Sequence, residues 1–428
     1  MQNAVIEALR VFQTLTGQYR DRTVFGTTTA QAFYDLRTQI PTFYVFSITD
    51  DQLLSEIQAH LLEPQSNPWT GSDQFSIPAI ASSMNNVRDQ FLLDSGIYIQ
   101  RPAFTSVSPM TGRLQLPQSI IDIRRAAWQD SSTLKTWSLY RNDEYAMTSY
   151  LPSWAQTPGL PQSYSVALTP PVELQLMPAP TNAGTPDLCI TESGPQLNLN
   201  PSSPVILGVP DDLCWAVKYG TMEQLLTSDG NVRDPARAKF CGDLYDLGVS
   251  LARNPVTTLQ VSINDVPIQT CSIDDLDKYN TNWQNTLGQP NRAAMVGANL
   301  LVLCGDSANS TSGVPDSNGP YGVTIDLART FPVPDPLNPT TTFLQVGLEL
   351  INPILDMAQH ICSLKMEGPE FQQTLALRNN FLRACARQNG SLRSNVFYNL
   401  LLNQPASRQD MQVPKTVPRE NPEEVTAS

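Results

Sequence analysis

The sequence is poor in charged side chains: Asp, Glu, Lys and Arg form 16% of its 428 residues, against a usual share of about 25%. Basic residues number 27 and acidic residues 40, which gives a net charge of −13. Proteins that clamp duplex DNA neutralise its phosphates with Lys and Arg, so this balance argues against a DNA clamp. It is compatible with a passive channel, because a repulsive lining lets DNA slide.

Lysine is the scarcest of the charged residues, since only six of the 27 basic residues are Lys and the others are Arg. Arg is enriched at protein interfaces and Lys is depleted there, so this choice fits a surface that neighbouring proteins cover. A GC-rich genome, which favours Arg codons, explains it equally well.

The motifs of several enzyme and metal-binding classes are missing. The sequence has no HExxH, GxSxG, GxGxxG or GxxxxGK pattern, and its seven cysteines contain no CxxC pair. We therefore expect buried, reduced thiols, no metal, no cofactor and no enzymatic activity. The N-terminus lacks a basic region followed by an apolar run, and no stretch has 18 uninterrupted apolar residues, so we expect neither a secretory signal nor a membrane span.

What the sequence contains is a hydrophobic period that changes along the chain. Apolar residues recur at helical spacing in residues 1–100, whereas residues 172–176 (VELQL) and similar segments alternate as half-buried strands do. The pattern predicts an α+β fold, with helical N- and C-terminal parts and a central helical pair, separated by two antiparallel β regions. The expected regions are 1–100 (helical), 101–210 (antiparallel β), 211–255 (helical pair), 256–342 (second β region), 343–404 (helical) and 405–428 (flexible tail or arm).

Local signals predict individual helices. Residues 28–40 carry a helical apolar stripe that ends at a proline, and Thr49 and Gln52 match a capping box. Asn352 and Pro353 resemble a cap followed by a first-turn proline, so we expect a helix to begin there. Further helices are expected at residues 78–94, 211–228, 234–253, 370–387 and 392–402.

The remaining candidates for chemistry have a structural interpretation that we prefer. His60 and His360 lie on predicted amphipathic helices and do not form a zinc-binding pair. Residues 306–318 are rich in oxygen ligands for calcium but lack the EF-hand order, so we interpret them as a surface loop. Acidic clusters could serve glycoside hydrolysis, but we interpret them as helix caps or surface groups. These clusters are Asp50–Asp51, Asp143–Glu144, Asp211–Asp212 and the group Asp274, Asp275 and Asp277.

Several short motifs follow one another between residues 120 and 255. They are residues 123–128 (IRRAAW), 139–143 (LYRND), 151–154 (LPSW), 158–161 (PGLP), 209–213 (VPDDL), 216–219 (AVKY) and 234–237 (DPAR). This order resembles a group of tailed-bacteriophage virion proteins at the head–tail junction, the adaptor or neck (connector) proteins under the portal. The likeness extends more loosely to residues 283–284, 358–360, 371 and 381–382. Residues 1–100 and the C-terminal tail carry little of it.

The resemblance implies a structural subunit that joins the portal to the tail and continues the DNA channel. It implies a ring of probably twelve copies, contacts with portal protein and with tail or fibre proteins, and DNA that passes without sequence-specific binding. The protein would be made in the host cytoplasm, contact no membrane and reside in the virion. The candidate structural or interface residues are Arg124, Arg125, Trp128, Arg141, Asp143, Trp154, Arg378, Arg383 and Arg387.

One alternative is a tail-tip or fibre-attachment protein that binds a receptor through the aromatic residues of the first β region. Trp128, Trp137, Tyr140, Trp154 and Tyr164 could form a sugar-binding platform, although a strand core explains them as well. The other alternative is a cell-wall hydrolase that uses Asp143 or Glu144.

Overall fold

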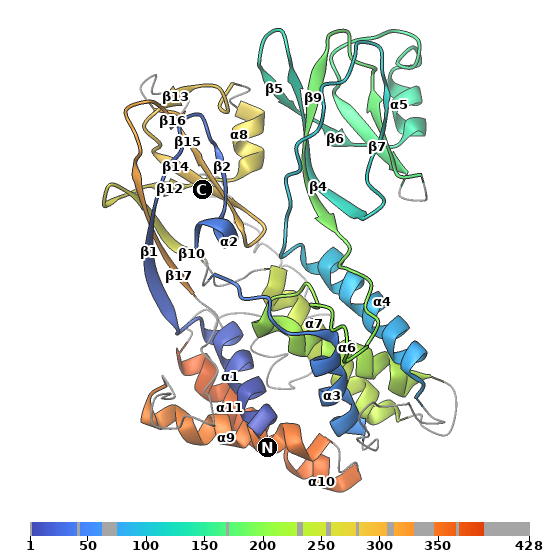
Figure 1. The fold of residues 1–428 in the computed structure, drawn as a ribbon, viewed down its shortest axis with the longest axis vertical. Coiled ribbons are helices and arrows are strands. Elements are labelled where there is room, and N and C mark those ends of the chain that lie inside the picture. The colour runs from blue at the N-terminus through green and yellow to red at the C-terminus, as the bar shows by residue number, and fades with distance from the viewer. Residues whose placement is uncertain are drawn as a thin grey trace, which may run out of the picture.

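The computed structural model shows two strand-rich lobes on a base of helices (Figure 1). Lobe 1 consists of residues 101–192, and lobe 2 combines residues 20–40 with residues 258–328. The structure describes residues 2–40, 43–61, 75–167, 171–228, 234–253, 258–279, 282–305, 312–328, 346–364 and 368–388.

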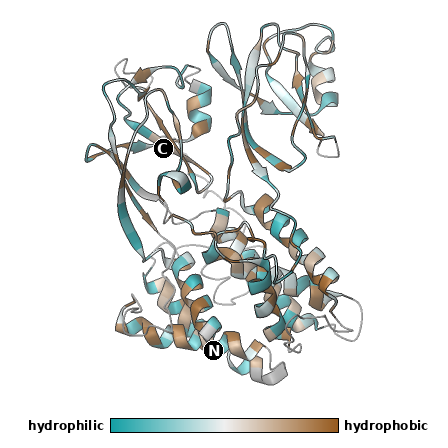
Figure 2. Cartoon of the chain, viewed as in Figure 1, coloured by the Kyte–Doolittle hydropathy of each residue, from teal (hydrophilic) through white to brown (hydrophobic). Residues whose placement is uncertain are grey.

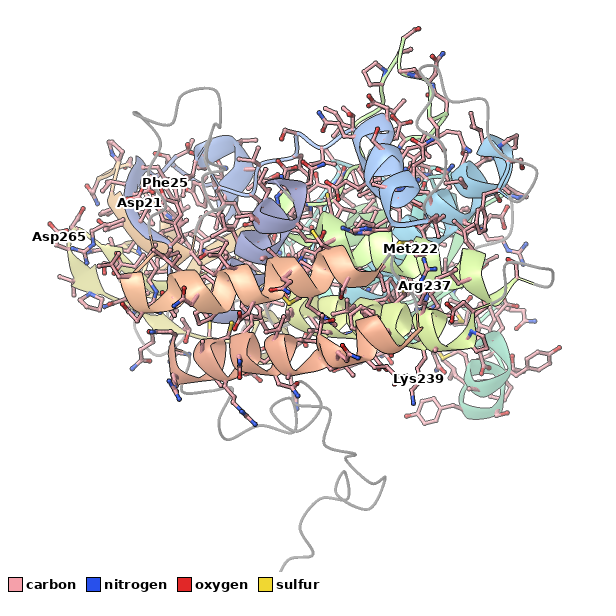
Figure 3. All side chains as sticks on the ribbon, turned by 90° about the horizontal axis from the view of Figure 1, so that it is seen from below. Asp21, Phe25, Met222, Arg237, Lys239 and Asp265 are labelled. Atoms are coloured by element: carbon pink, nitrogen blue, oxygen red, sulfur yellow. The ribbon has the colours of Figure 1, made fainter. Side chains whose placement is uncertain are left out.

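The helical base surrounds the largest hydrophobic core of the described chain, and its helices come from five separate stretches. In Figure 2 these helices carry hydrophobic and hydrophilic segments next to each other, as amphipathic helices do. Figure 3, viewed from below, shows α9 and α11 lying side by side across the base. The helices of the base are α1 (Gln2–Thr16), α3 (Asp50–Leu61), α4 (Ile77–Ser95), η1 (Asp211–Leu213), α6 (Cys214–Thr227), α7 (Pro235–Arg253), α9 (Leu348–Ser363), α10 (Gly368–Gln373) and α11 (Leu375–Gln388).

Helix α4 connects the base to lobe 1, and its ends follow local rules. The Ser76 side chain accepts a hydrogen bond from the Ala79 amide, and Pro78 occupies the first turn, where a missing amide proton costs least. Gly96 ends the helix at φ +57°, a left-handed conformation that glycine adopts without strain.

Lobe 1 contains two sheets around a core of its own. The long strands β4 and β9 pair antiparallel with β5 at one edge, in the order β5-β4-β9, and the other sheet has the order β3-β8-β7-β6. The elements of lobe 1 are β3 (Arg113–Gln115), β4 (Ile120–Asp130), β5 (Thr136–Ser138), β6 (Tyr140–Arg141), α5 (Glu144–Tyr150), β7 (Ser163–Ala167), β8 (Glu173–Met177) and β9 (Gly184–Glu192).

Lobe 2 takes strands from both halves of the chain. Its sheets have the orders β1-β17-β10-β11, β12-β14-β15-β2 and β13-β16. The N-terminal elements are β1 (Arg20–Gly26), β2 (Phe33–Asp35) and α2 (Leu36–Gln39). The others are β10 (Thr258–Ile263), β11 (Val266–Pro267), β12 (Gln269–Thr270), α8 (Ile273–Tyr279), β13 (Leu287–Gly288), β14 (Arg292–Val296), β15 (Leu300–Cys304), β16 (Val314–Pro315) and β17 (Gly322–Ala328).

The α+β class predicted from the sequence is confirmed, but the N-terminal region is not helical throughout. Residues 28–40 do not form one helix, because Phe33 and Tyr34 join β2 and pair with Val302 and Leu301. Strand β1 pairs with β17 over its whole length. The N-terminal segment therefore completes the sheets of lobe 2. Both β regions were expected to be antiparallel, but each contains parallel as well as antiparallel pairs.

The C-terminal helices also differ from the prediction. Helix α9 begins at Leu348 and contains Pro353, because Leu350 extends the buried stripe of Ile354 one turn toward the N-terminus. The helix expected at residues 370–387 is divided near Thr374, whose hydroxyl donates a hydrogen bond to the Phe371 carbonyl at 2.7 Å and so competes with regular helix geometry. The predicted helix at 392–402 and the tail at 405–428 lie outside the described residues.

A buried ion-pair group stabilises the centre of the base. Lys218 of α6 is fully buried and donates to the carboxylates of Glu7 in α1 and Glu56 in α3, the latter at 3.2 Å. The Tyr219 hydroxyl donates to the second oxygen of Glu7 at 2.7 Å. Burial opposes the charge of Lys218, but the two carboxylates outweigh it and raise the pKa of its ammonium group. Three helices therefore depend on one cation.

Replacing that cation should destabilise the base strongly. Lys218→Met leaves Glu7 buried without a cation, and we expect it to lower the free energy of unfolding by about 3–5 kcal/mol. Urea unfolding followed by tryptophan fluorescence measures this. The control is Arg22→Ala, which breaks the exposed Arg22–Asp326 pair and should change little. Equal losses of unfolding free energy in the two variants would contradict the role of Lys218 as the cation that holds the three helices.

Like charges of carboxylates on α6 and α7 predict that replacing one of them stabilises the chain, and that the gain depends on pH. Burial, together with the carboxylates of Asp246 and Asp243, raises the pKa of Glu223. Folding therefore favours the protonated form of Glu223. The folded chain loses stability as the pH rises through the raised pKa of this carboxyl group. Glu223→Gln should stabilise the chain by less than about 1 kcal/mol at neutral pH and have no effect near pH 4.

Thermal unfolding of this variant at the two pH values tests the expectation. Glu349→Gln, on the exposed first turn of α9, is the matched control and should give no stabilisation at either pH. A Glu223→Gln variant that is less stable than the parent chain at neutral pH would contradict the prediction.

Candidate functional site

A buried arginine joins the two lobes. Arg125 of β4 pairs through both edges of its guanidinium: Nε and Nη2 donate to the two oxygens of Asp277 at 2.6 and 2.8 Å, and Nη1 donates to Asp187 at 2.7 Å. Asp187 lies on β9 of lobe 1, whereas Asp277 lies on α8 of lobe 2. All three side chains are buried, so the contact spans the boundary between the lobes out of reach of solvent.

Three further side chains also donate hydrogen bonds to the carboxylates of Asp187 and Asp277. Arg101 donates from Nε to Asp187 at 2.6 Å, and Gln284 donates from Nε2 to the same carboxylate at 2.9 Å. The Trp283 indole donates to Asp277 at 2.9 Å. We call these six residues, from Arg101 to Gln284, the lobe junction. Because its carboxylates each accept several hydrogen bonds, the junction meets the condition under which buried ion pairs persist.

The ring of Phe33 lies beside the arginines of the lobe junction. The guanidinium carbon of Arg101 is 4.0 Å from the ring centroid, and that of Arg125 is 5.7 Å away. Strand β2, which carries Phe33, belongs to the N-terminal segment of lobe 2. The N-terminal segment therefore also contributes to the junction, through cation–π contacts.

The electrostatics of the lobe junction indicate a structural role. Burial opposes ionisation of Asp187, but Arg125 and Arg101 outweigh it and hold the pKa of this carboxyl well below its usual range. Burial raises the pKa of the adjacent Cys189 thiol to about 11, so the thiol stays protonated and unreactive at neutral pH. Charges that are fully paired and a protonated thiol supply neither a general base nor a nucleophile.

A second group of the predicted residues lies at the surface of lobe 1. Arg124 and Arg141 both pair with Asp122, at 3.1 and 3.2 Å. Asp143 accepts a hydrogen bond from the Ala146 amide at 2.6 Å and so caps α5, as the interpretation of the acidic pairs as helix caps predicts. Asp143 is therefore occupied as a cap, and the hydrolase alternative gains no support from this geometry.

Exposed tyrosines surround this cap. Tyr140, Tyr145 and Tyr150 are 64%, 88% and 84% exposed, and they lie on β6 and α5. Of the three, Tyr145 lines a hollow of about 600 Å³, together with residues 141–144 and 165–167. We call the three tyrosines and this hollow the tyrosine surface. Two of the tyrosines were missed from the sequence, although Tyr145 and Tyr150 stand close together in a polar segment, which is the signal that could have found them.

Four of the nine candidate structural or interface residues are buried within this chain and serve its own interior. Trp128 belongs to the core of lobe 1, Trp154 packs against Met147, and Arg125 lies in the lobe junction. Arg378 is buried in the base with its guanidinium carbon 5.5 Å from the Phe240 ring centroid. Large aromatic and Arg side chains bury much area, so in a folded chain they also serve its own interior. Exposed members of the set are Arg124, Arg141, Asp143, Arg383 and Arg387.

The aromatic residues that could have formed a sugar platform are dispersed. Trp128 and Tyr164 are in the core of lobe 1, Trp137 packs against that core, and Tyr140 is exposed. Asp277 corrects another interpretation, since it is buried in the lobe junction and is neither a cap nor a surface group. Asp187 and Arg101 were missed, and the only sequence signal was that Asp187 directly precedes the apolar run 188–190 in β9.

His360 lies in a helix as expected, but it is only partly satisfied, because its buried Nε2 has no hydrogen-bond partner. Its Nδ1 lies 2.8 Å from the Thr374 hydroxyl, and its ring stacks on Phe371. Burial, with a smaller effect of Arg378, lowers the pKa of His360 to about 3, so it is neutral at physiological pH. Of the loop at 306–318, residues 306–311 lie outside the described part.

Two further searches concern the described residues alone. Within them no three His, Cys, Asp or Glu side chains are grouped so that they could bind a metal ion. Among the helices in the described ranges, none combines the length and apolarity needed to cross a membrane. Comparison with known proteins adds no relative: no family model matches the sequence, and no curated protein matches it.

The lobe junction yields a prediction with a control one residue away. Arg125→Met leaves Asp187 and Asp277 buried without their shared cation, so we expect a loss of about 3–5 kcal/mol in unfolding free energy and faster hydrogen exchange in α8 and β9. Arg124→Met removes an arginine from the half-buried Asp122 pair and a hydrogen bond to the Leu93 carbonyl, but leaves Asp187 and Asp277 paired, so it should cost less than Arg125→Met and leave exchange in α8 unchanged. Similar exchange in both variants would contradict a role of Arg125 in holding the lobes together.

Proposed function

We propose that the chain is a structural subunit of a tailed-phage virion, a head–tail adaptor or neck ring that joins the portal to the tail and continues the DNA channel. The observation that carries the proposal is that the chain has two exposed contact faces at opposite ends of its long axis. Helix α5, which carries two of the exposed tyrosines, lies on the outer side of lobe 1 in its upper part, whereas α9 and α11 lie across the bottom of the base (Figure 1). A subunit between two partners needs two such faces.

The lower face carries apolar and basic side chains. Leu348 is 85% exposed at the start of α9 and Leu355 is also exposed, while Arg383 and Arg387 are exposed on α11. Exposed Leu and Arg side chains are common anchors of protein interfaces, because they bury area and pair with carbonyls or carboxylates at low desolvation cost. We assign this face to the portal or to neighbouring copies.

Internal charge pairing supports a mechanical role. The lobe junction uses scarce charges to join lobe 1 to lobe 2, and the Lys218 group uses them to join three helices within the base. A net charge of −13 suits the wall of a channel through which DNA slides without being held. A closed ring of copies needs head-to-tail contacts, in which one face of each copy meets a different face of the next.

Reconstitution with portal tests the proposal. The purified full-length chain is mixed with purified portal, and masses are measured by mass photometry, with electron microscopy of the virion locating the chain. We expect a ring, dodecameric by resemblance, that binds portal and lies under it in the virion. A chain that stays monomeric at micromolar concentration and fails to bind portal would overturn the proposal.

A second candidate function is favoured by the tyrosine surface itself. Exposed tyrosines beside a hollow also suit a receptor-binding face, as in a tail-tip or fibre-attachment protein. Binding of the full-length chain to a glycan array, abolished by Tyr145→Ser, would favour this alternative over the adaptor.

A further inference from the structure

A groove of about 370 Å³ lies where the N-terminal segment of lobe 2 meets the start of lobe 1. Its lining comes from residues between 31 and 38, in and around β2 and α2, from residues 98–102 and from Leu300. Arg37 lines it from the first segment and Arg101 from the second. Sites that hold small molecules have volumes of about 300–1,000 Å³, so the groove has room for a small ligand.

Arg101 uses only part of its guanidinium group in the lobe junction. Its Nε donates to Asp187 at 2.6 Å, whereas neither Nη1 nor Nη2 has a hydrogen-bond partner in the part of the chain that the structure describes. The guanidinium lies over the Phe33 ring, with its carbon 4.0 Å from the centroid. The side chain of Arg101 is 35% exposed, so the N–H groups of both Nη atoms are available to an acceptor in the groove.

Arg37 is fixed in a similar way on the lobe 2 side of the groove. Its Nε and Nη2 donate to the carboxylate of Asp35, at 3.3 and 2.9 Å. Its guanidinium carbon lies 3.9 Å from the centroid of the Tyr98 ring. A carboxylate and an aromatic ring therefore hold each of the two arginines in place. Side chains that are already ordered lose little conformational entropy when a ligand binds.

The groove carries a net positive charge in an acidic chain. Its lining has two cations, Arg37 and Arg101, and one anion, Asp35. Both oxygens of Asp35 already accept hydrogen bonds from Arg37. Asp187, the partner of Arg101, is buried and also pairs with Arg125. Although the whole chain has a net charge of −13, an anionic ligand is therefore favoured at this place.

We propose that the groove binds a dianionic phosphate group, free or as a monoester, which accepts hydrogen bonds from Arg101 and Arg37. A carboxylate is satisfied by one edge of one guanidinium, as Asp277 is by Arg125 at 2.6 and 2.8 Å. A phosphate monoester has three strong acceptor oxygens and a charge of about −1.5 to −2 at neutral pH. It therefore suits donors that come from two segments better than a carboxylate does.

A bound phosphate would add a second connection between the lobes, beside the lobe junction. Arg101 stands at the start of lobe 1 and also belongs to the junction, whereas Arg37 belongs to α2 of lobe 2. An anion that both arginines contact would therefore tie α2 to residues 98–102. The groove belongs to a single copy of the chain, so phosphate binding does not depend on the proposed ring.

Titration of the full-length chain with inorganic phosphate, followed by ³¹P NMR, tests the site. Arg101→Lys keeps a cation beside Asp187 but removes the planar fork, so we expect about tenfold weaker binding. Arg37→Gln removes the cation from the other segment and should weaken binding by a similar factor. Arg113→Lys, on the exposed strand β3, is the matched control and should bind as the parent chain does. No binding to the parent chain, or equal losses in all three variants, would overturn the inference.

Hydrogen exchange locates the bound anion with a second readout. Inorganic phosphate should slow amide exchange in residues 31–38 and 98–102, because a ligand that both segments contact opposes their local opening. Exchange in β3, which lies outside the groove, should not change. Arg101→Lys should lose the slowing in both segments. Slowing at other places only, or no slowing in the parent chain, would contradict binding in the groove.

Competing anions test the chemical class of the ligand. Acetate that binds as tightly as phosphate would overturn the assignment to a phosphate dianion. An oligothymidylate without terminal phosphates that binds more tightly would also overturn it, in favour of a nucleic-acid backbone. Glycerol 3-phosphate distinguishes the two sources that the proposal allows. Tighter binding than inorganic phosphate, again weakened by Arg101→Lys, would support a phosphate monoester, and weaker binding would support free phosphate.

Discussion

The shared guanidinium of Arg125 is the contact on which the placement of the two lobes depends. It pairs with Asp187 within lobe 1 and with Asp277 from lobe 2, so removing it would leave two buried carboxylates facing each other. Each desolvated ion costs several kcal/mol unless it is paired, and this cost makes the junction hold the lobes in one arrangement. The group around Lys218 acts in the same way among the helices of the base. A chain with few charges thus uses several of them internally.

This use of charge connects the fold to the proposed role. A subunit that transmits load between a portal and a tail needs parts that do not slide against each other, and buried ion pairs with several hydrogen bonds supply that rigidity. The exposed features are then the tyrosine surface and the outer side chains of α9 and α11, at opposite ends of the long axis (Figure 1).

Sequence reasoning succeeded where the determining interactions are local. Helix α7 follows from Asp234 and Pro235, and the Thr49 amide donates to Gln52 as the capping box predicts. It failed where pairing between segments distant in sequence determines the secondary structure or the burial of a side chain. Phe33 belongs to an apolar stripe at helical spacing, yet it forms a strand because β15, more than 260 residues later, supplies the ladder. The same limit applies to the site: Arg125 was identified as a candidate, but its partner Asp277 is 152 residues away and was interpreted as a surface group.

By itself the sequence determined the α+β class, the caps that start individual helices, and a composition in which Arg replaces most Lys. These properties depend on side-chain periodicity and on neighbours a few residues apart. Only the tertiary structure decided which of the scarce charges are buried in pairs, that N-terminal strands complete lobe 2, and which aromatic side chains remain exposed. The physical reason is that burial and ion pairing arise between segments distant in sequence, so no local pattern encodes whether Trp128 lies in a core or Tyr145 at a surface.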